Sequence, residues 1–234
     1  MDETNLPAPD KNGIIRALPE DLSEQNRSRM NKFGAFMTLY DFFQDRMVRP
    51  RIHKADPERH HRLMHDLLSS VHYARILDVA CGTGGLIPSI HRSNTYVGLD
   101  LSYTMLLQAI RKVARKSFLR WRLIQGNAEA LLFGDEAFEL VVMDTALHMI
   151  PKYREAVSEA ARVLVEGGSL VCSTPAVGLD DAFDRGWARI SGKRGLHSLS
   201  EEELAGVCGE NGLEYTSVYT NGGVLYFKAR KVPR

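Results

Sequence analysis

Five short apolar runs, separated by segments of helical periodicity, constrain the fold of this 234-residue chain more than any other feature. They occupy residues 75–79, 96–99, 121–124, 138–143 and 169–173. A near-continuous apolar run is typical of a strand buried on both faces, and strands that alternate with helices build parallel sheets. We therefore expect a single α/β domain, since a chain of this length can bury one core of that kind.

The C-terminal third of the chain departs from this alternation. Two extended runs, 213–219 and 224–229, are joined by Thr220-Asn221-Gly222-Gly223. Asparagine and glycine suit the positive backbone angles of tight hairpin turns, so this segment predicts a terminal β-hairpin. The mostly parallel sheet is therefore expected to end in an antiparallel pair.

Helix boundaries can also be read from the sequence. Apolar residues recur at helical spacing over 152–165, and Gly167-Gly168 is expected to end that helix. Ser200 and Glu203 have the spacing of a capping box, and Gly212 suits the C-terminal end of the helix that Ser200 opens.

The chain before the sheet divides into two parts. Residues 1–25 are polar and proline-containing, which predicts a flexible arm. Residues 26–72 are expected to form a helical cover, with an aromatic and methionine-rich helix over 33–48 and another that begins at Asp56-Pro57. Residues 73–234 then form the main domain.

Composition excludes several classes of function. The 30 basic and 29 acidic residues give a net charge of +1, so no overall field favours nucleic acid as a partner. No apolar run is long enough for a transmembrane segment, and the acidic N-terminus does not resemble a signal peptide, so we expect a cytoplasmic protein. Three widely spaced cysteines predict no disulfides. His61 and His65 share a helical face at i and i+4, but they lack a carboxylate at the expected place and a cysteine partner, so we expect no metal.

The turn 78–85 follows the first apolar run and carries the clearest functional signal. Gly82 and Gly84 allow a sharp turn and close approach of a ligand, and a helix is expected to start near Gly84. The dinucleotide fingerprint would have a third glycine where Ile87 stands. A compact nucleoside is therefore favoured over a ligand with a pyrophosphate.

Two further polar segments follow the next strands. Gly98-Leu99-Asp100 places a carboxylate where acids commonly accept hydrogen bonds from ribose hydroxyls. Gly126-Asn127-Ala128-Glu129 follows the third strand and offers an amide that could contact an adenine edge. Because these segments end successive strands, they are expected to meet at one edge of the sheet.

At these positions the chain resembles the class I S-adenosylmethionine-dependent methyltransferases, especially the branch that includes ubiquinone and menaquinone C-methyltransferases. The resemblance covers about residues 74–230. The matching segments are Ile76-Leu77-Asp78-Val79-Ala80-Cys81-Gly82-Thr83-Gly84, Gly98-Leu99-Asp100-Leu101-Ser102, Gln125-Gly126-Asn127-Ala128-Glu129-Ala130-Leu131, and Arg162-Val163-Leu164 with Gly167-Gly168.

The resemblance implies a Rossmann-like, seven-stranded, mostly parallel sheet with a C-terminal antiparallel hairpin, and S-adenosyl-L-methionine as cofactor. It places the methionine part on the glycine turn, the ribose on Asp100 and the adenine near Asn127 and Ala128. Many members have aspartate where Asn127 stands, so a carbonyl would replace a carboxylate here. The cofactor-binding residues expected are Asp78, Ala80, Cys81, Gly82, Thr83, Gly84, Asp100, Leu101, Asn127, Ala128, Asp144 and Tyr40.

Methyl transfer is a displacement at a sulfonium carbon, so alignment and exclusion of water matter more than a base. Where a proton must leave the acceptor, Asp144 and His148 are the best-placed catalytic candidates, because they follow the fourth apolar run. A wall for the acceptor is also expected over 176–199. The predicted substrate contacts are Phe36, Tyr40, His148, Trp187 and His197.

The leading hypothesis is methylation of carbon or oxygen on a small apolar or aromatic acceptor, such as a quinone-like compound, a lipid or a secondary metabolite. An N-methyltransferase for a polar metabolite or lipid headgroup is one alternative. A cofactor-binding regulatory or partner subunit without turnover is another, because its cofactor motifs would look the same. The chain is expected to be a monomer or a homodimer.

Overall fold

The computed structural model describes residues 6–32 and 39–233. The strands are β1 Ile14–Arg16, β2 Arg75–Val79, β3 Thr95–Asp100, β4 Arg120–Gln125, β5 Phe138–Asp144, β6 Leu164–Val177, β7 Leu199–Ser200, β8 Leu213–Asn221 and β9 Val224–Lys231. The α-helices are α1 Glu24–Lys32, α2 Tyr40–Phe43, α3 Pro57–Leu68, α4 Tyr103–Lys116, α5 Tyr153–Val163, α6 Asp181–Arg194 and α7 Glu201–Glu210. The other helices are η2 Gln44–Ile52, a π-helix, and two short 3-10 helices, η3 Ile87–Ser89 and η4 Leu147–Met149.

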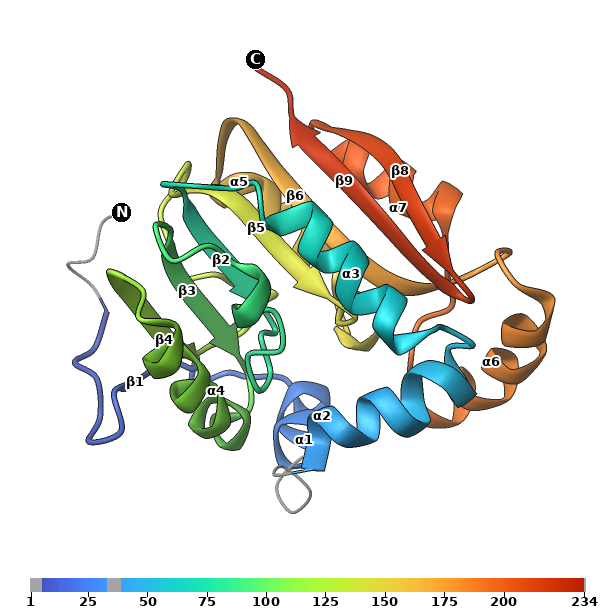
Figure 1. Ribbon diagram of the computed structural model, residues 1–234, viewed down its shortest axis with the longest axis horizontal. Helices are drawn as coiled ribbons and strands as arrows, with labels where there is room; N and C mark the ends of the chain where they lie inside the picture. Colours follow the sequence, from blue (N-terminus) through green and yellow to red (C-terminus); the bar gives the residue numbers. More distant parts are fainter. Residues whose placement is uncertain (1–5, 33–38, 234) are drawn as a thin grey trace.

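One sheet organises the molecule, with strands in the order β1-β4-β3-β2-β5-β6-β9-β8 and with β7 paired to β6 (Figure 1). The pairings from β4 to β6 are parallel, and the β6–β9 and β8–β9 pairings are antiparallel. This confirms the mostly parallel sheet with a C-terminal antiparallel hairpin.

Helices cover both faces of the sheet. In Figure 1, α3 and α4 lie in front of the strands, and α5 and α7 lie behind them. Each face has its own apolar core: Leu68 and Leu106 pack on the α3 and α4 side, and Ala160 and Val207 on the α5 and α7 side. The strands between them are buried on both sides, which is why their sequences are nearly continuous apolar runs.

Two helix starts form as the sequence predicts. The Asp56 side chain accepts a hydrogen bond from Arg59 N at 2.6 Å, with Pro57 as the first helical residue of α3. Ser200 Oγ accepts from Glu203 N at 3.1 Å at the start of α7. The carboxylate of Glu203 accepts instead from the Tyr153 hydroxyl, so it ties α7 to α5.

The structure differs from the sequence prediction at both glycine-rich segments. No α-helix starts near Gly84: the described chain forms turns and then only the short helix η3. Pro88 lacks the N–H that a continuing helix needs, and the next strand begins at Thr95. The prediction that Gly167-Gly168 ends a helix is also wrong, because α5 ends at Val163 and both glycines lie within β6.

The N-terminal arm contains a strand that the sequence did not suggest. Residues 14–16 form β1, which pairs in parallel with β4 at the edge of the sheet. Ile14 is fully buried, and Tyr103 from α4 donates a 2.5 Å hydrogen bond to Asp10. Three residues are too few for a periodicity signal, so only the tertiary contacts reveal this strand.

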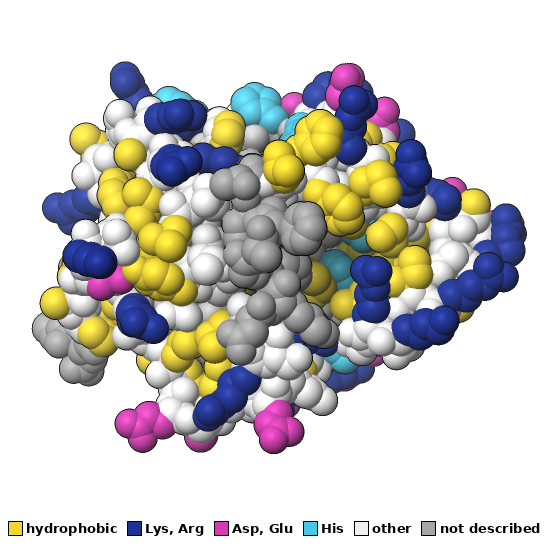
Figure 2. Space-filling model, turned by 90° about the horizontal axis from the view of Figure 1, so that it is seen from below, with side chains coloured by type: hydrophobic (Ala, Val, Ile, Leu, Met, Phe, Trp, Pro, Cys, Tyr) yellow, Lys and Arg dark blue, Asp and Glu magenta, His cyan; other side chains and the backbone are white. Residues whose placement is uncertain are grey.

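The aromatic and methionine-rich cover differs from its predicted packing. The structure describes it from residue 39 onward, so Phe36 lies outside the described residues. A stripe of apolar residues at helical spacing is usually core, but Phe43 and Met47 of this stripe are 51% and 37% exposed. Figure 2 looks onto this edge of the molecule and shows hydrophobic side chains at the surface among lysines and arginines.

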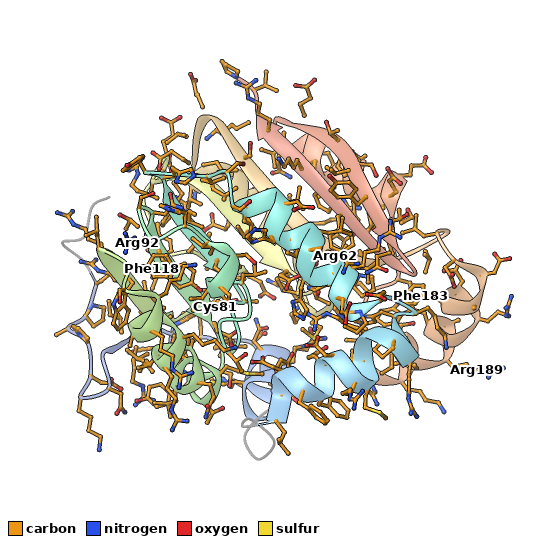
Figure 3. All side chains as sticks on the ribbon, viewed as in Figure 1. Arg62, Cys81, Arg92, Phe118, Phe183 and Arg189 are labelled. Carbon is orange, nitrogen blue, oxygen red and sulfur yellow. The ribbon has the colours of Figure 1, made fainter. Side chains whose placement is uncertain are left out.

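The turn of the β8–β9 hairpin packs tightly against two other segments. A Cβ on Gly222 would lie 2.0 Å from Lys54 O, and one on Gly223 would lie 2.1 Å from Phe183 Cγ on α6. Figure 3 shows Phe183 beside the tip of the hairpin. Gly223 N also donates to His53 O at 2.8 Å. The hairpin turn therefore joins the cover, α6 and the sheet.

We expect Gly223→Ala to lower the free energy of unfolding by about 2 kcal/mol, because an added methyl group would overlap the Phe183 ring in a tightly packed region. Gly186→Ala is a matched control, since a Cβ there meets nothing within 4 Å inside α6 and should leave stability unchanged or slightly higher. Urea unfolding followed by circular dichroism measures both. Equal stability of the two variants would contradict the packing described.

Candidate functional site

Three carboxylates converge at the carboxyl edge of the sheet. Asp100 and Asp144 are the last residues of β3 and β5, and Asp78 lies near the end of β2 between them. The parallel register aligns Asp78 with Gly98 on β3 and with Val142 on β5. Parallel strands place such side chains together, as the sequence predicted, in the crevice where open α/β sheets bind ligands.

The glycine turn is held to Asp100. Gly82 N donates to Asp100 Oδ2 and Ser102 N donates to Asp100 Oδ1, both at 2.8 Å. Burial raises the pKa of Asp100 to about 6, against the lowering effect of these two N–H groups. The carboxylate is thus fixed in orientation and ionised at neutral pH, with further lone pairs available to hydroxyl donors.

The backbone of the turn explains its sequence. Gly82 and Gly84 have φ of +56° and +76°, and Ala80 has φ of +57°. A Cβ on Gly84 would lie 2.4 Å from Ile87 Cδ1. The glycines are therefore required by backbone conformation and by close packing.

Asp78 is a buried side chain that joins β2 to β3 through Tyr96. The Tyr96 hydroxyl donates to Asp78 Oδ2 at 2.8 Å, and burial raises the pKa of Asp78 to about 8. It is therefore mostly protonated at neutral pH and can donate a hydrogen bond through its carboxyl group. Cys81, also buried, has its pKa raised by the same loss of solvent, so it remains a thiol.

A contact that the sequence did not suggest ties the cover to the glycine turn. Thr83 Oγ1 donates to Asp41 Oδ1 at 2.5 Å, and Lys112 Nζ from α4 forms a 2.6 Å ion pair with Asp41 Oδ2. Tyr40 follows the same segment: burial raises its pKa to about 12, and both Asp100 and Asp144 contribute in that direction. Tyr40 therefore lies near both carboxylates, and its contact with the cofactor stays a prediction.

Asp144 has more side-chain partners than the other two acids. Ser173 Oγ donates to Asp144 Oδ1 at 2.5 Å, and Asp144 Oδ2 lies 3.4 Å from His60 Nε2. Burial alone would raise the pKa of Asp144, but His60, the nearby Arg49 guanidinium and the Ser173 hydroxyl hold it below the usual range. Asp144 is therefore ionised, and its carboxylate is already engaged.

His148 lies in a cluster of three buried rings. Its ring centroid is 6.0 Å from that of His53 and 5.5 Å from that of Trp187, and the His53 and Trp187 centroids are 5.9 Å apart. Burial lowers the pKa of His148 well below its usual value, so the imidazole is neutral. His53 was missed at the sequence level because it belongs to no motif and reaches the cluster only through the fold.

Two other predicted contacts have structural partners. Asn127 Oδ1 accepts from Glu129 N at 3.1 Å, and this shapes the loop that would face the adenine. His197 Nε2 lies 3.0 Å from Ile150 O and 3.1 Å from Pro151 O, which fixes the chain after η4. The adenine contact of Asn127 and the acceptor contact of His197 stay predictions.

The described part of the chain contains neither a metal centre nor a membrane-spanning helix. Within residues 6–32 and 39–233, no three His, Cys, Asp or Glu side chains are grouped so that they could hold a metal ion. None of the helices in those ranges combines the length and apolar character needed to cross a bilayer.

Comparison with known proteins identifies the domain. Residues 76–168 match a family model described as a methyltransferase domain. This stretch contains all three carboxylates and the glycine turn. Over this stretch the chain is similar to methyltransferase domains.

Curated relatives match part of this methyltransferase domain. The demethylmenaquinone methyltransferases of Shouchella clausii and Bacillus subtilis are each 36% identical to it, over 100 and 103 residues. The match covers 41% of this chain and 43% of the first relative, and 42% and 44% for the second. The chain thus matches less than half the length of either relative.

Solved structures share the fold of the methyltransferase domain at low sequence identity. The YcgJ protein from Bacillus subtilis has a TM-score of 0.65 and 18% identity, covering 76% of this chain and 100% of that chain. Geranyl diphosphate C-methyltransferase from Streptomyces coelicolor, solved with S-adenosyl-L-homocysteine, has a TM-score of 0.60 and 17% identity, covering 75% and 79%.

The donor set fits S-adenosyl-L-methionine, the cofactor of this class. The oriented Asp100 carboxylate suits two ribose hydroxyls, and the crowded Gly84 position leaves no room for a side chain beside the turn. Asp144 ends β5 at the same edge and Tyr40 lies near it, and their contact with the cofactor stays a prediction.

We expect Asp100→Asn to weaken binding of S-adenosylhomocysteine at least about tenfold, because it removes a charged acceptor from the ribose hydroxyls. In the wild type, affinity should also fall several-fold between pH 7.5 and pH 5.5, since protonation of a carboxyl with pKa about 6 removes the same acceptor. Isothermal titration calorimetry measures both effects. Glu214→Gln, an exposed change on β8, is the control; unchanged affinity in Asp100→Asn would exclude the ribose assignment.

Proposed function

We propose that this chain transfers a methyl group from S-adenosyl-L-methionine to carbon or oxygen of a small apolar or aromatic acceptor. The observation that carries this proposal is the position of a buried aromatic cluster. Two of its residues lie on segments that follow β5 and β6, next to the carboxyl edge of the sheet. His148 lies four residues after Asp144, and Trp187 lies on α6, which follows β6, the strand paired with β5. A cofactor site and an enclosed ring cluster thus share one edge of the sheet.

The chain's own residues supply binding and orientation. Asp100 fixes the ribose, and the glycine turn allows the backbone to approach the cofactor closely. The cofactor, when bound, supplies a methyl group on a positively charged sulfur. Alignment of the acceptor and exclusion of water then provide most of the rate, because the displacement itself needs no covalent help from the protein.

The character of the acceptor follows from its surroundings. Phe183 stacks on Trp187 with ring centroids 5.1 Å apart. His53 and His148 complete the wall, and each is at most 4% exposed. Flat apolar surfaces of this kind favour a ring or an isoprenoid-like chain over a strongly hydrated metabolite. The names of the curated relatives, demethylmenaquinone methyltransferases, support a quinone-like acceptor.

His148 and Asp144 would have different roles. A neutral imidazole can accept a hydrogen bond from an acceptor hydroxyl or orient it, so His148 acts as base or orienting residue. Asp144 is ionised and engaged by Ser173, Arg49 and His60, so it would act through electrostatic positioning at the cofactor.

A labelled-methyl assay tests the acceptor class. Purified protein with methyl-labelled S-adenosylmethionine should place label in an apolar cell extract and not in an aqueous or macromolecular extract. Label only in the aqueous fraction would favour the N-methyltransferase alternative. Cofactor binding without label in any fraction would favour the partner subunit without turnover, and either result overturns the proposal.

We expect His148→Ala to reduce turnover about a hundredfold with the labelled apolar fraction, because positioned proton transfer or hydrogen bonding typically contributes that much. Its affinity for S-adenosylhomocysteine should stay within twofold of the wild type. His72→Ala, at an exposed site after α3, is the matched control. Unaltered turnover in His148→Ala would remove this residue from the mechanism.

A further inference from the structure

Three buried ring nitrogens in one cluster have no hydrogen-bond partner within the described ranges. They are His53 Nδ1, His148 Nδ1 and Trp187 Nε1. A buried polar group left without a partner typically costs about 1–3 kcal/mol, so such groups are uncommon in folded proteins. Three of them on rings that pack against one another point to a place where a polar ligand atom belongs.

The cluster is assembled from distant parts of the chain. His53 follows η2, His148 lies in η4 and Trp187 lies on α6. Their side chains are 3%, 4% and 1% exposed, and each ring meets the other two at steep angles of 62° to 87°. The three rings therefore pack edge to face instead of stacking on one another.

The hairpin turn fixes His53 in this position. Gly223 N donates to His53 O, and the Asn221 side chain exchanges hydrogen bonds with Asp56, accepting from its N at 3.0 Å and donating to its O at 2.8 Å. Phe183, one helical turn before Trp187, packs directly on Gly223. The same turn thus locates two of the three rings, and this explains why its glycines are needed.

The charge state of the cluster is neutral. Burial lowers the pKa of His53 to about 3, and Arg49 and His60 act in the same direction, while Asp144 opposes them. His148 is neutral for the same primary reason, with His53, Arg29 and His197 adding to the effect. An uncharged imidazole offers one N–H donor and one acceptor nitrogen, and the indole offers a donor only.

We propose that His53, His148 and Trp187 form a subsite that binds one oxygen of the acceptor, a neutral phenolic or enolic hydroxyl or the corresponding ketone. This inference rests on the proposed function and narrows its substrate class to ring compounds that carry such an oxygen. The indole N–H donates to the oxygen, and an imidazole nitrogen accepts from a hydroxyl or donates to a carbonyl. A hydrocarbon would leave all three nitrogens without partners.

Charged groups fit this subsite poorly. An ammonium or a carboxylate group would lose its hydration among three buried rings, where an isolated charge is costly. A neutral oxygen satisfies the ring nitrogens without that cost.

Calorimetry with three probes of similar shape tests the subsite. Protein saturated with S-adenosylhomocysteine is titrated at pH 7 into 2-naphthol, naphthalene or 2-naphthoate. We expect 2-naphthol to bind about tenfold more tightly than naphthalene, because a buried hydrogen bond contributes about that factor, and more tightly than 2-naphthoate. Absent binding of 2-naphthol, or equal binding of 2-naphthol and naphthalene, overturns the inference.

Variants that replace a nitrogen-bearing ring with an apolar ring locate the effect. His53→Phe and Trp187→Phe should bind 2-naphthol no more tightly than naphthalene, while naphthalene affinity stays unchanged. His72→Phe and Trp121→Phe, which change the same residue types away from the cluster, should keep the preference. Retained preference in both His53→Phe and Trp187→Phe overturns the subsite.

Affinity for S-adenosylhomocysteine separates this inference from the function on which it rests. Variants that bind it like the wild type are folded, so a lost preference for 2-naphthol then reports on the subsite. A wild type that prefers 2-naphthol but labels no extract retains the subsite and loses the proposed turnover. A wild type that turns over an apolar acceptor without that preference retains the function and loses the subsite.

Discussion

Parallel pairing of β3, β2 and β5 is the constraint on which the rest of the site depends. Because the three strands run in the same direction and in register, their carboxyl ends meet at one edge. Asp100, Asp78 and Asp144 are brought together by that register, although Asp78 and Asp144 are 66 positions apart in the sequence. The cover, η4 and α6 then contribute residues to the same edge.

Three neighbouring acids at this edge have three different states because their partners differ. Asp78 loses solvent and gains only a tyrosine hydroxyl, so its pKa rises to about 8. Two backbone N–H groups offset part of the same loss at Asp100, and its pKa is about 6. Asp144 gains Arg49, His60 and Ser173, and its pKa falls. This edge of the sheet thus carries a mostly protonated Asp78, an Asp100 carboxylate oriented to accept hydrogen bonds, and an ionised Asp144.

The two ends of the chain cooperate at the acceptor side. The C-terminal hairpin does more than complete the sheet, since its turn holds His53 and packs on Phe183. The cover is attached to the cofactor side by Asp41, through Thr83 and Lys112.

The sequence by itself determined the parallel sheet, its terminal hairpin, the glycine turn and the acids that end the strands. These features have local causes: apolar runs report burial on both faces, and glycine reports backbone angles that other residues avoid. The prediction of a helix near Gly84 was wrong, because the chain around Pro88 forms turns and a short helix. Strand β1 was missed because it is too short to give a sequence pattern. Only the tertiary structure decided that His53 joins His148 and Trp187, that Asp41 reaches Thr83, and which acid is charged. Those outcomes depend on contacts between segments far apart in sequence, where burial and neighbouring charges are set by packing and leave no periodic mark on the chain.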